Sequence, residues 1–229
     1  MGKKAICAAA GLTVAGLWGL ERYGRRSGAT KEEGRLPLPG DDVVARPLWA
    51  STRAITIDAP PERVWPWIVQ MGFPPHRAGW YTPHWMDVAM WGDRPRSAAR
   101  IVPELQDLRV GDTVPDSADY SVYYEVEAVV PPAQASEGTP AHLLLHSVRH
   151  VFGPIKQSDF TWLFALQPLG EDRTRLLARA RVRYGPLWAV PAIELMLNAG
   201  DLANVSAMLR NIKQSVEDGR QVPAPPVTR

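Results

Sequence analysis

The residues whose types and spacing suit chemistry gather in one aromatic segment, residues 73–99. His76, His84 and Asp87 lie there. A histidine close to a carboxylate is suited to proton transfer or to binding a metal ion. These three side chains are therefore the first candidates for acid-base groups or ligands.

A second set of histidines is less promising. His142, His146 and His150 share one face of an expected strand, and at about 3.3 Å per residue neighbouring members lie some 13 Å apart. That distance is too long for two of them to ligate one metal ion. The sequence predicts no metal site and no cofactor.

Well-known catalytic motifs are absent from the sequence. It has no G-x-S-x-G turn, no H-E-x-x-H pair, no phosphate-binding glycine loop and no C-x-x-C pair. Cys7 is the single cysteine, so no disulfide can form within the chain. Hydrolase, zinc-protease, nucleotide-dependent and redox functions all lose their usual support.

The charge of the 229-residue chain is unevenly distributed. Residues 1–26 carry five basic side chains and one acidic one, whereas the remainder has a small excess of acidic over basic residues. The positive net charge therefore belongs to the amino terminus and not to a binding face. This pattern argues against a nucleic-acid-binding domain.

The amino terminus contains an apolar run at residues 5–20, flanked by lysines and arginines. As a helix it would span about 24 Å, somewhat less than a hydrocarbon core of about 30 Å. We favour a retained membrane anchor, with the domain on the cytoplasmic side because positive charge is heavier after the run. The alternative is a secretory signal and an exported protein.

A strand followed at once by a helix is expected between Ala54 and Gly72. Ile55 and Ile57 alternate with polar residues as in a half-buried strand, and Pro61 suits a first helical position. Five residues form the predicted buried side of this helix, with Trp67 outside it. They are Val64, Trp65, Ile68, Val69 and Gly72.

The segment after this helix is rich in large rings and has little strand character. Trp80, Tyr81, Trp85 and Trp91 fall within twelve positions. We expect them to cover the mouth of an apolar cavity. The alternative is that they fill the core beneath a long loop.

Alternating patterns then predict a series of antiparallel strands near residues 121–130, 142–150, 159–167 and 173–184. In the last strand arginines line one face, which we expect to be solvated, with exposed ion pairs to neighbouring strands. The opposite face contains Ala178 and Ala180, which leave room for a cavity or for a closing helix.

An amphipathic helix is expected at residues 201–217, with Asp201 as its cap and an apolar lead-in at residues 187–197. Its apolar stripe has the three- and four-residue spacing of a helix that lies on a sheet. The stripe consists of Leu202, Val205, Met208, Leu209, Ile212 and Val216.

The chain resembles a bacterial, membrane-anchored branch of the START-like (SRPBCC) superfamily, which includes polyketide cyclases and lipid carriers. The resemblance rests on residues 54–72, 38–42, 77–81 and 101–105. It implies an α+β helix-grip fold, in which a curved antiparallel sheet wraps around a long C-terminal helix and encloses an apolar cavity. The N-terminal hydrophobic helix would be an addition to that fold.

The expected division has four parts. Residues 1–26 are the anchor or signal, 27–50 a linker or a family-shared extension that packs on the domain, 51–219 the START-like ligand-binding domain, and 220–229 a disordered tail. Oligomeric state stays open.

Two functions follow from the resemblance. The first is binding or transfer of a small apolar ligand such as a lipid, isoprenoid or polyketide near the membrane. The alternative is a cyclase or dehydratase whose acid-base candidates are Tyr81, His84, Asp87 and Glu104. Whether the protein is an enzyme stays open. The expected ligand-binding residues are Trp80, Tyr81, Trp85, Trp91, Tyr124, Trp162, Ala178, Ala180, Leu202, Val205 and Leu209.

Overall fold

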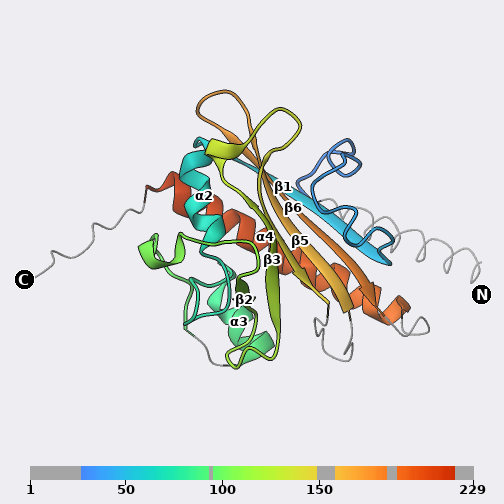
Figure 1. Ribbon diagram of the computed structural model, residues 1–229. Helices are drawn as coiled ribbons and strands as arrows, with labels where there is room; N and C mark the ends of the chain where they lie inside the picture. The colour runs from blue at the N-terminus through green and yellow to red at the C-terminus, as the bar shows by residue number, and fades with distance from the viewer. Residues whose placement is uncertain (1–26, 93–94, 149–157, 185–189, 220–229) are drawn as a thin grey trace, which may run out of the picture.

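The computed structural model describes residues 27–92, 95–148, 158–184 and 190–219, with side chains except at 90, 91, 190–196 and 199. Figure 1 shows the elements in order of colour along the chain. They are β1 (Trp49–Ile57), α2 (Pro61–Val69), α3 (His84–Trp91), η1 (Pro103–Leu105), β2 (Thr113–Pro115), β3 (Tyr123–Val130), η2 (Pro132–Gln134), β4 (Ala141–Ser147), β5 (Ser158–Pro168), β6 (Thr174–Tyr184) and α4 (Val190–Glu217).

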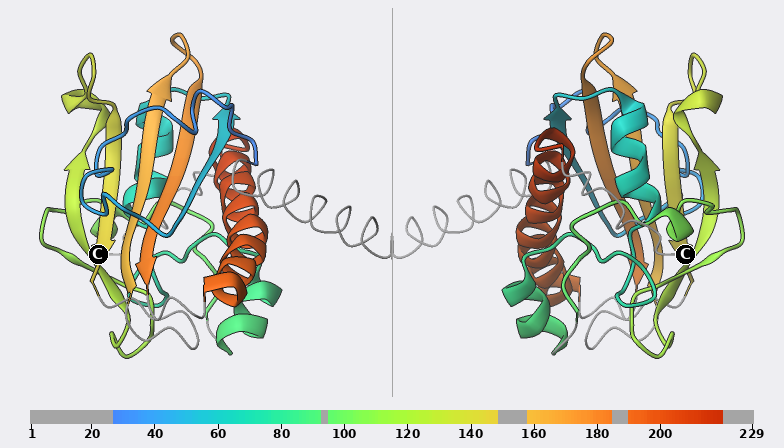
Figure 2. Two further views of the ribbon diagram at one scale, coloured as in Figure 1. Left: turned by 90° about the vertical axis from the view of Figure 1, so that its right-hand side faces the viewer. Right: turned by 90° about the vertical axis from the view of Figure 1, so that its left-hand side faces the viewer.

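The strands form one antiparallel sheet in the order β1-β6-β5-β4-β3-β2. The long C-terminal helix α4 crosses one face, which we call the inner face, and residues 27–48 cover part of the other, the outer face (Figure 2). This confirms the expected α+β class and the antiparallel sheet with its C-terminal helix. The predicted N-terminal hydrophobic helix lies outside the described residues.

The alternation predicted for β6 is confirmed. Leu176, Ala178, Ala180 and Val182 belong to the main core on the inner face, and Leu177 belongs to a smaller cluster on the outer face. In β3 a bulge between Val126 and Ala128 reverses the phase that the sequence predicts. Ala128 consequently packs on the outer cluster.

The main core lies between the inner face, α2 and α4. From α4 it contains Val205, Met208, Leu209, Ile212 and Val216, all buried. Leu202, predicted on the same stripe, is only half-buried. The amphipathic stripe thus holds the helix against the sheet as expected.

The helix α4 begins earlier than predicted. It runs without interruption from Val190, so Asp201 lies in its interior and is not a cap. The side chain of Asp201 turns to β1 and accepts hydrogen bonds from Arg53. Asp201 therefore serves as the ion partner of the buried Arg53 and not as a helix cap.

The helix α2 also differs from prediction on one point. Trp67, expected outside the buried side, is 4% exposed and packs edge-on against Tyr81 at 5.7 Å between ring centroids. The prediction failed because α2 is covered on two sides. The orphan carbonyls at its end are satisfied by Arg77, which donates to the oxygens of Val69 and Met71.

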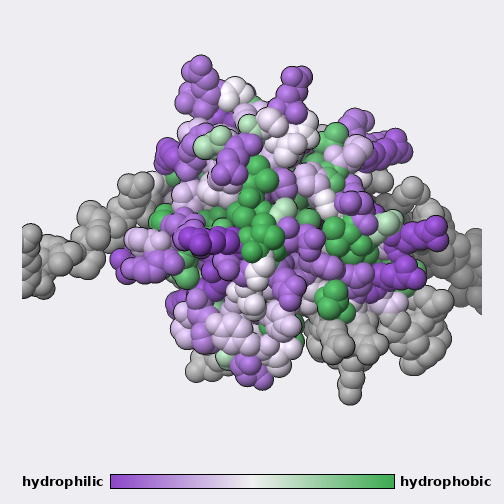
Figure 3. All heavy atoms as spheres, in the orientation of Figure 1, coloured by the Kyte–Doolittle hydropathy of each residue, from purple (hydrophilic) through white to green (hydrophobic). Residues whose placement is uncertain are grey.

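Residues 27–48, which we call the strap, pack on the outer face. The strap approaches the sheet so closely that a Cβ atom at Gly28 would lie 2.2 Å from the carbonyl oxygen of Ala54. Gly28 also has φ +77°, which favours glycine. On the face turned to the viewer in Figure 3, hydrophilic side chains predominate around hydrophobic ones near the middle.

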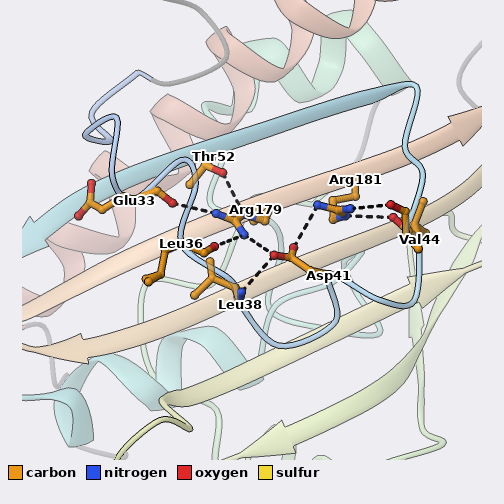
Figure 4. A network of polar contacts seen from close by, with 9 residues as sticks. Glu33, Leu36, Leu38, Asp41, Val44, Thr52, Arg179 and Arg181 are labelled. Carbon is orange, nitrogen blue, oxygen red and sulfur yellow. Dashed lines mark hydrogen bonds and ion pairs between the residues drawn. The ribbon is translucent and has the colours of Figure 1, made fainter.

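The arginine stripe of β6 holds the strap, which corrects the prediction of a solvated face. Arg179 is 5% exposed and donates to Asp41 (2.7 Å) and to the carbonyl oxygens of Leu36 and Glu33 (both 2.8 Å). Figure 4 shows the carboxylate of Asp41 between Arg179 and Arg181. These two arginines pair with a carboxylate of the strap and not with the expected carboxylates on neighbouring strands.

Within the described residues, no helix is both long and apolar enough to cross a bilayer. The apolar run at residues 5–20 lies outside the described residues.

Candidate functional site

The inner face presents a wall of aromatic rings. Trp80 stacks on Trp162 with ring centroids 5.1 Å apart and lies edge-on to Tyr124 at 5.9 Å. Phe160 and Phe164 extend the wall on either side of Trp162, at 6.1 Å and 5.0 Å. Three of the expected ligand-binding residues, Trp80, Tyr124 and Trp162, therefore come together.

Strand register explains why the rings fit. Trp162 pairs with Ala180 and Phe164 with Ala178 across β5 and β6. Since residues opposite each other in an antiparallel pair share a face, each large ring stands beside a methyl group. The two alanines singled out from the sequence provide the room that the rings occupy.

The segment with Trp80 is fixed by backbone contacts. Tyr81 has φ 57°, an uncommon value for a residue other than glycine. Its N–H donates to the hydroxyl of Ser97 (3.0 Å), and its carbonyl oxygen accepts from the amide of Asn211 on α4 (2.7 Å). The strained backbone of Tyr81 is thus supported from two sides, which orients the neighbouring Trp80.

Tyr81 is a buried phenol with a defined partner. Its oxygen accepts a hydrogen bond from the amide of Gln70 at 2.6 Å. Burial raises the pKa of Tyr81 well above its ordinary value, so the phenol keeps its proton at neutral pH. With its pKa raised, the phenol is a weak acid that can donate a hydrogen bond and does not act as a base.

Gln70 was missed by sequence analysis. It is buried, and its amide oxygen accepts from the backbone N–H of Val102 (2.8 Å) and from Gln106 (3.1 Å). These bonds fix the amide that contacts Tyr81. A glutamine near the end of a helix has no sequence signal for such a role, because its partners lie more than ten residues away.

Some buried polar atoms in this region have no hydrogen-bond partner among the described residues. They include Nε1 of Trp80, Nδ1 of His84 and Oδ1 of Asn204. Asn204 precedes Asn211 by two turns of α4 and so lies on the same face, toward the segment that contains Tyr81. Because a buried polar atom without a partner is costly, either ordered water or a bound ligand would satisfy these atoms.

A buried ion pair joins β1 to α4 beside the wall. Arg53 is 1% exposed, and its Nε donates to Asp201 at 2.8 Å, while Trp49 donates to Asn198 at 2.7 Å. Burial raises the pKa of Asp201, and Arg53 opposes that rise. The positive charge on the inner face is thereby neutralised. The alternation places Arg53 on the same face as Ile55 and Ile57, but it gave no sign of the partner Asp201.

Several predicted site residues do not lie in the core. Trp85 is 71% exposed and Glu104 is also exposed, because α3 and η1 turn these side chains outward. Asp87 is buried and accepts a hydrogen bond from the hydroxyl of Thr82 at the start of α3. The side chain of Trp91 lies outside the described residues.

Of the three ligand-binding residues predicted on α4, two are buried and one is not. Val205 and Leu209 lie in the core, whereas Leu202 sits at its edge. Of the three expected strand histidines, His142 and His146 face the outer side of β4, away from the wall, and His150 lies outside the described residues. In the described part of the chain, no group of three metal-ligating side chains has an arrangement that could hold a metal ion.

Two hollows lie away from the wall. One of about 110 Å³ separates α2 from the C-terminal end of α4 and is lined by Trp67, Ile101 and Val216. A larger one of about 440 Å³ lies beside β3 and β4 and is lined by Tyr123, His146 and other residues. Neither contains the unpartnered atoms.

Comparison with known families and with curated proteins finds no match. Among solved structures, the chain is similar to an aromatase/cyclase from Streptomyces sp. R1128, with 14% identity, 77% of this chain and 96% of that one covered, and TM-score 0.44. It is also similar to norcoclaurine synthase from Thalictrum flavum, with 12% identity, 81% and 96% covered, and TM-score 0.46. At these values the likenesses assign no substrate or reaction to this chain.

Proposed function

We propose that this protein binds a small, mainly apolar ligand against the aromatic wall, between the inner face and α4. The observation that carries the proposal is the indole N–H of Trp80, a buried donor without a partner among the described residues. An acceptor oxygen on the ligand would satisfy it. The surrounding rings would supply apolar contact, as in most small-molecule sites.

Charge favours a neutral ligand over an anion. Arg53 is held by Asp201, so this cation is not available to a carboxylate or a phosphate. The indole N–H of Trp80 offers a neutral hydrogen-bond donor instead. We infer an aromatic or polycyclic ligand with a carbonyl or hydroxyl oxygen.

Native mass spectrometry of the purified full-length chain tests this proposal. We expect a copurifying neutral molecule, or binding of the neutral probe 1-naphthol when none copurifies. Trp80→Phe keeps a ring but removes the N–H, so it should weaken naphthol binding by about fivefold or more, the value of one hydrogen bond. Trp65→Phe, a half-buried ring elsewhere, is the control. Equal affinity of both variants would contradict the proposal.

A cyclase- or dehydratase-like activity is the second candidate, and one observation favours it. His84 has a buried ring nitrogen without a partner among the described residues, and Tyr81 retains its proton. Enolisation requires a base and a hydrogen-bond donor that polarises the carbonyl group, and these two side chains would take those roles. A poly-β-ketone thioester incubated with the protein should cyclise faster than with His84→Gln. Equal rates of cyclisation with the native protein and with His84→Gln would oppose this alternative.

We further propose that residues 1–26 hold the protein at a membrane, with residues 51–219 as the ligand-binding domain. The support is the apolar run flanked by basic residues. Washing cell membranes with carbonate tests the anchor: full-length protein should stay in the pellet. Its release into the wash would contradict the anchor without affecting the ligand proposal.

A further inference from the structure

The helix α3 presents an apolar stripe to the surface. Trp85 is 71% and Val88 41% exposed, and Ala89 is exposed as well. The spacing of three and four residues puts these side chains on one face of the helix. The opposite side is fixed, since Asp87 is buried and bonded to Thr82.

Two basic residues follow α3 in the sequence. Arg96 and Arg100 are exposed, and neither side chain makes an ion pair among the described residues. The loop that carries them lies beside the segment that leads into α3, because the N–H of Ala98 donates to the carbonyl oxygen of Ala78 (2.7 Å). The single carboxylate of α3 is the buried Asp87, so the exposed surface here combines indole, aliphatic and guanidinium groups.

We propose that α3 docks on an anionic lipid surface, with Trp85 among the headgroups and Arg96 and Arg100 near the phosphates. Tryptophan is enriched at membrane interfaces because its ring is apolar and its N–H stays hydrated. Each exposed basic residue adds attraction to anionic lipid. The helix lies at the edge of the molecule, where it can meet a flat surface (Figure 2).

The size of the stripe favours lipid over a protein partner. A stable protein interface buries about 800 Å² on each side. One tryptophan contributes about 150 to 250 Å², and only Val88 adds another large apolar side chain to the described stripe. Insertion of a single ring between headgroups needs no such area. This docking does not depend on the ligand proposal.

A position-specific probe tests the docking in the full-length chain. Because two label positions are compared on the same chain, attachment through residues 1–26 cannot by itself produce the expected difference. In a Cys7→Ser background, Ala89→Cys is labelled with an environment-sensitive nitrobenzoxadiazole group. The matched control is Val110→Cys, which is 65% exposed in a different surface turn. With vesicles of phosphatidylcholine and phosphatidylglycerol, the label at 89 should shift to shorter wavelength and be quenched by nitroxide lipids. The label at 110 should not respond.

Variants make the test specific. Trp85→Ser should abolish most of the response at position 89, whereas Tyr123→Ser, an exposed ring on another face, should leave it unchanged. Arg96→Gln and Arg100→Gln should each lower the ratio of inserted to free label about fivefold in anionic vesicles. Equal responses at 89 and 110, or no loss with Trp85→Ser, would overturn the proposal. Unchanged circular dichroism shows that each variant is folded.

Discussion

At the scale of single residues, Arg179 joins the strap to the sheet through several hydrogen bonds. It donates hydrogen bonds to four partners: Thr52, Leu36, Asp41 and Glu33. A lysine has no planar fork of donors, so Arg179→Lys should leave buried acceptors unsatisfied. We expect a loss of about 3 kcal/mol in the free energy of unfolding, measured by urea denaturation. Arg183→Lys, exposed on the same face of the same strand, should change it by less than about 0.5 kcal/mol.

For Trp80, in contrast to Arg179, we expect substitution to change stability only slightly. Its N–H has no partner among the described residues, so Trp80→Phe removes a buried donor as well as part of a ring. The gain from losing the unsatisfied donor and the cost of the smaller ring are each about 1 to 3 kcal/mol and oppose one another. The free energy of unfolding should change by less than about 1.5 kcal/mol. A loss above about 3 kcal/mol would mean that the N–H is bonded in the folded protein.

These residues also mark a limit of sequence analysis. Arg179 and Arg183 occupy equivalent places in the alternation of β6, yet one is buried and the other exposed. The difference arises from Asp41, which is 138 positions away from Arg179 and, among the arginines of this stripe, pairs with Arg179 and Arg181. Spacing within a strand cannot encode a partner in a distant segment.

At the scale of elements, the strap should respond to acid. Two hydrogen bonds from Arg175, at 2.7 and 2.8 Å, hold the pKa of Glu33 below its ordinary value of 4.5. The free strap therefore takes up a proton more readily than the docked one. Docking is fully stabilised above about pH 4.5 and weakens as pH falls through the lower, docked pKa.

Hydrogen exchange measures this effect. Protection factors of amides at residues 30–45 should fall below about pH 4, while those of β5 stay high. Glu33→Gln should remove most of the pH dependence. Strap protection that is independent of pH in the native protein would contradict the role given to Glu33.

The contact between β1 and α4 depends on a buried charge pair. Asp201→Leu leaves Arg53 buried without its carboxylate and should cost about 3 to 5 kcal/mol. Arg53→Met combined with Asp201→Leu should recover most of that loss, because no uncompensated charge remains. Chemical denaturation of the single and double variants gives the coupling energy. Additive losses would show that the two side chains do not act as a pair.

Sequence patterns predicted whole elements better than their connections. Alternation located β6 and its inner face, and the stripe from Val205 to Val216 located the packed half of α4. The bulge in β3 and the helical start of α4 at Val190 were missed, since both depend on packing between elements. For the candidate site, the aromatic composition indicated Trp80 and Trp162, but exposure of Trp85 depends on how α3 is oriented.

At the scale of the whole molecule, the sheet is held between two coverings. The strap covers the outer face through β6 arginines, and α4 covers the inner face through an apolar stripe and the Arg53–Asp201 pair. The aromatic wall lies on the α4 side. Ligand binding at the wall should leave the contacts of the strap unchanged.

The indole signal of Trp80 in ¹H–¹⁵N spectra tests the central claim most directly. Trp80→Phe assigns the signal, and 1-naphthol is then titrated into the native protein. The account predicts that the Trp80 indole proton moves downfield as it gains an acceptor, while the indole of Trp85, exposed on α3, stays in place. Saturable naphthol binding that leaves the Trp80 signal unmoved, or no binding at all, would contradict it.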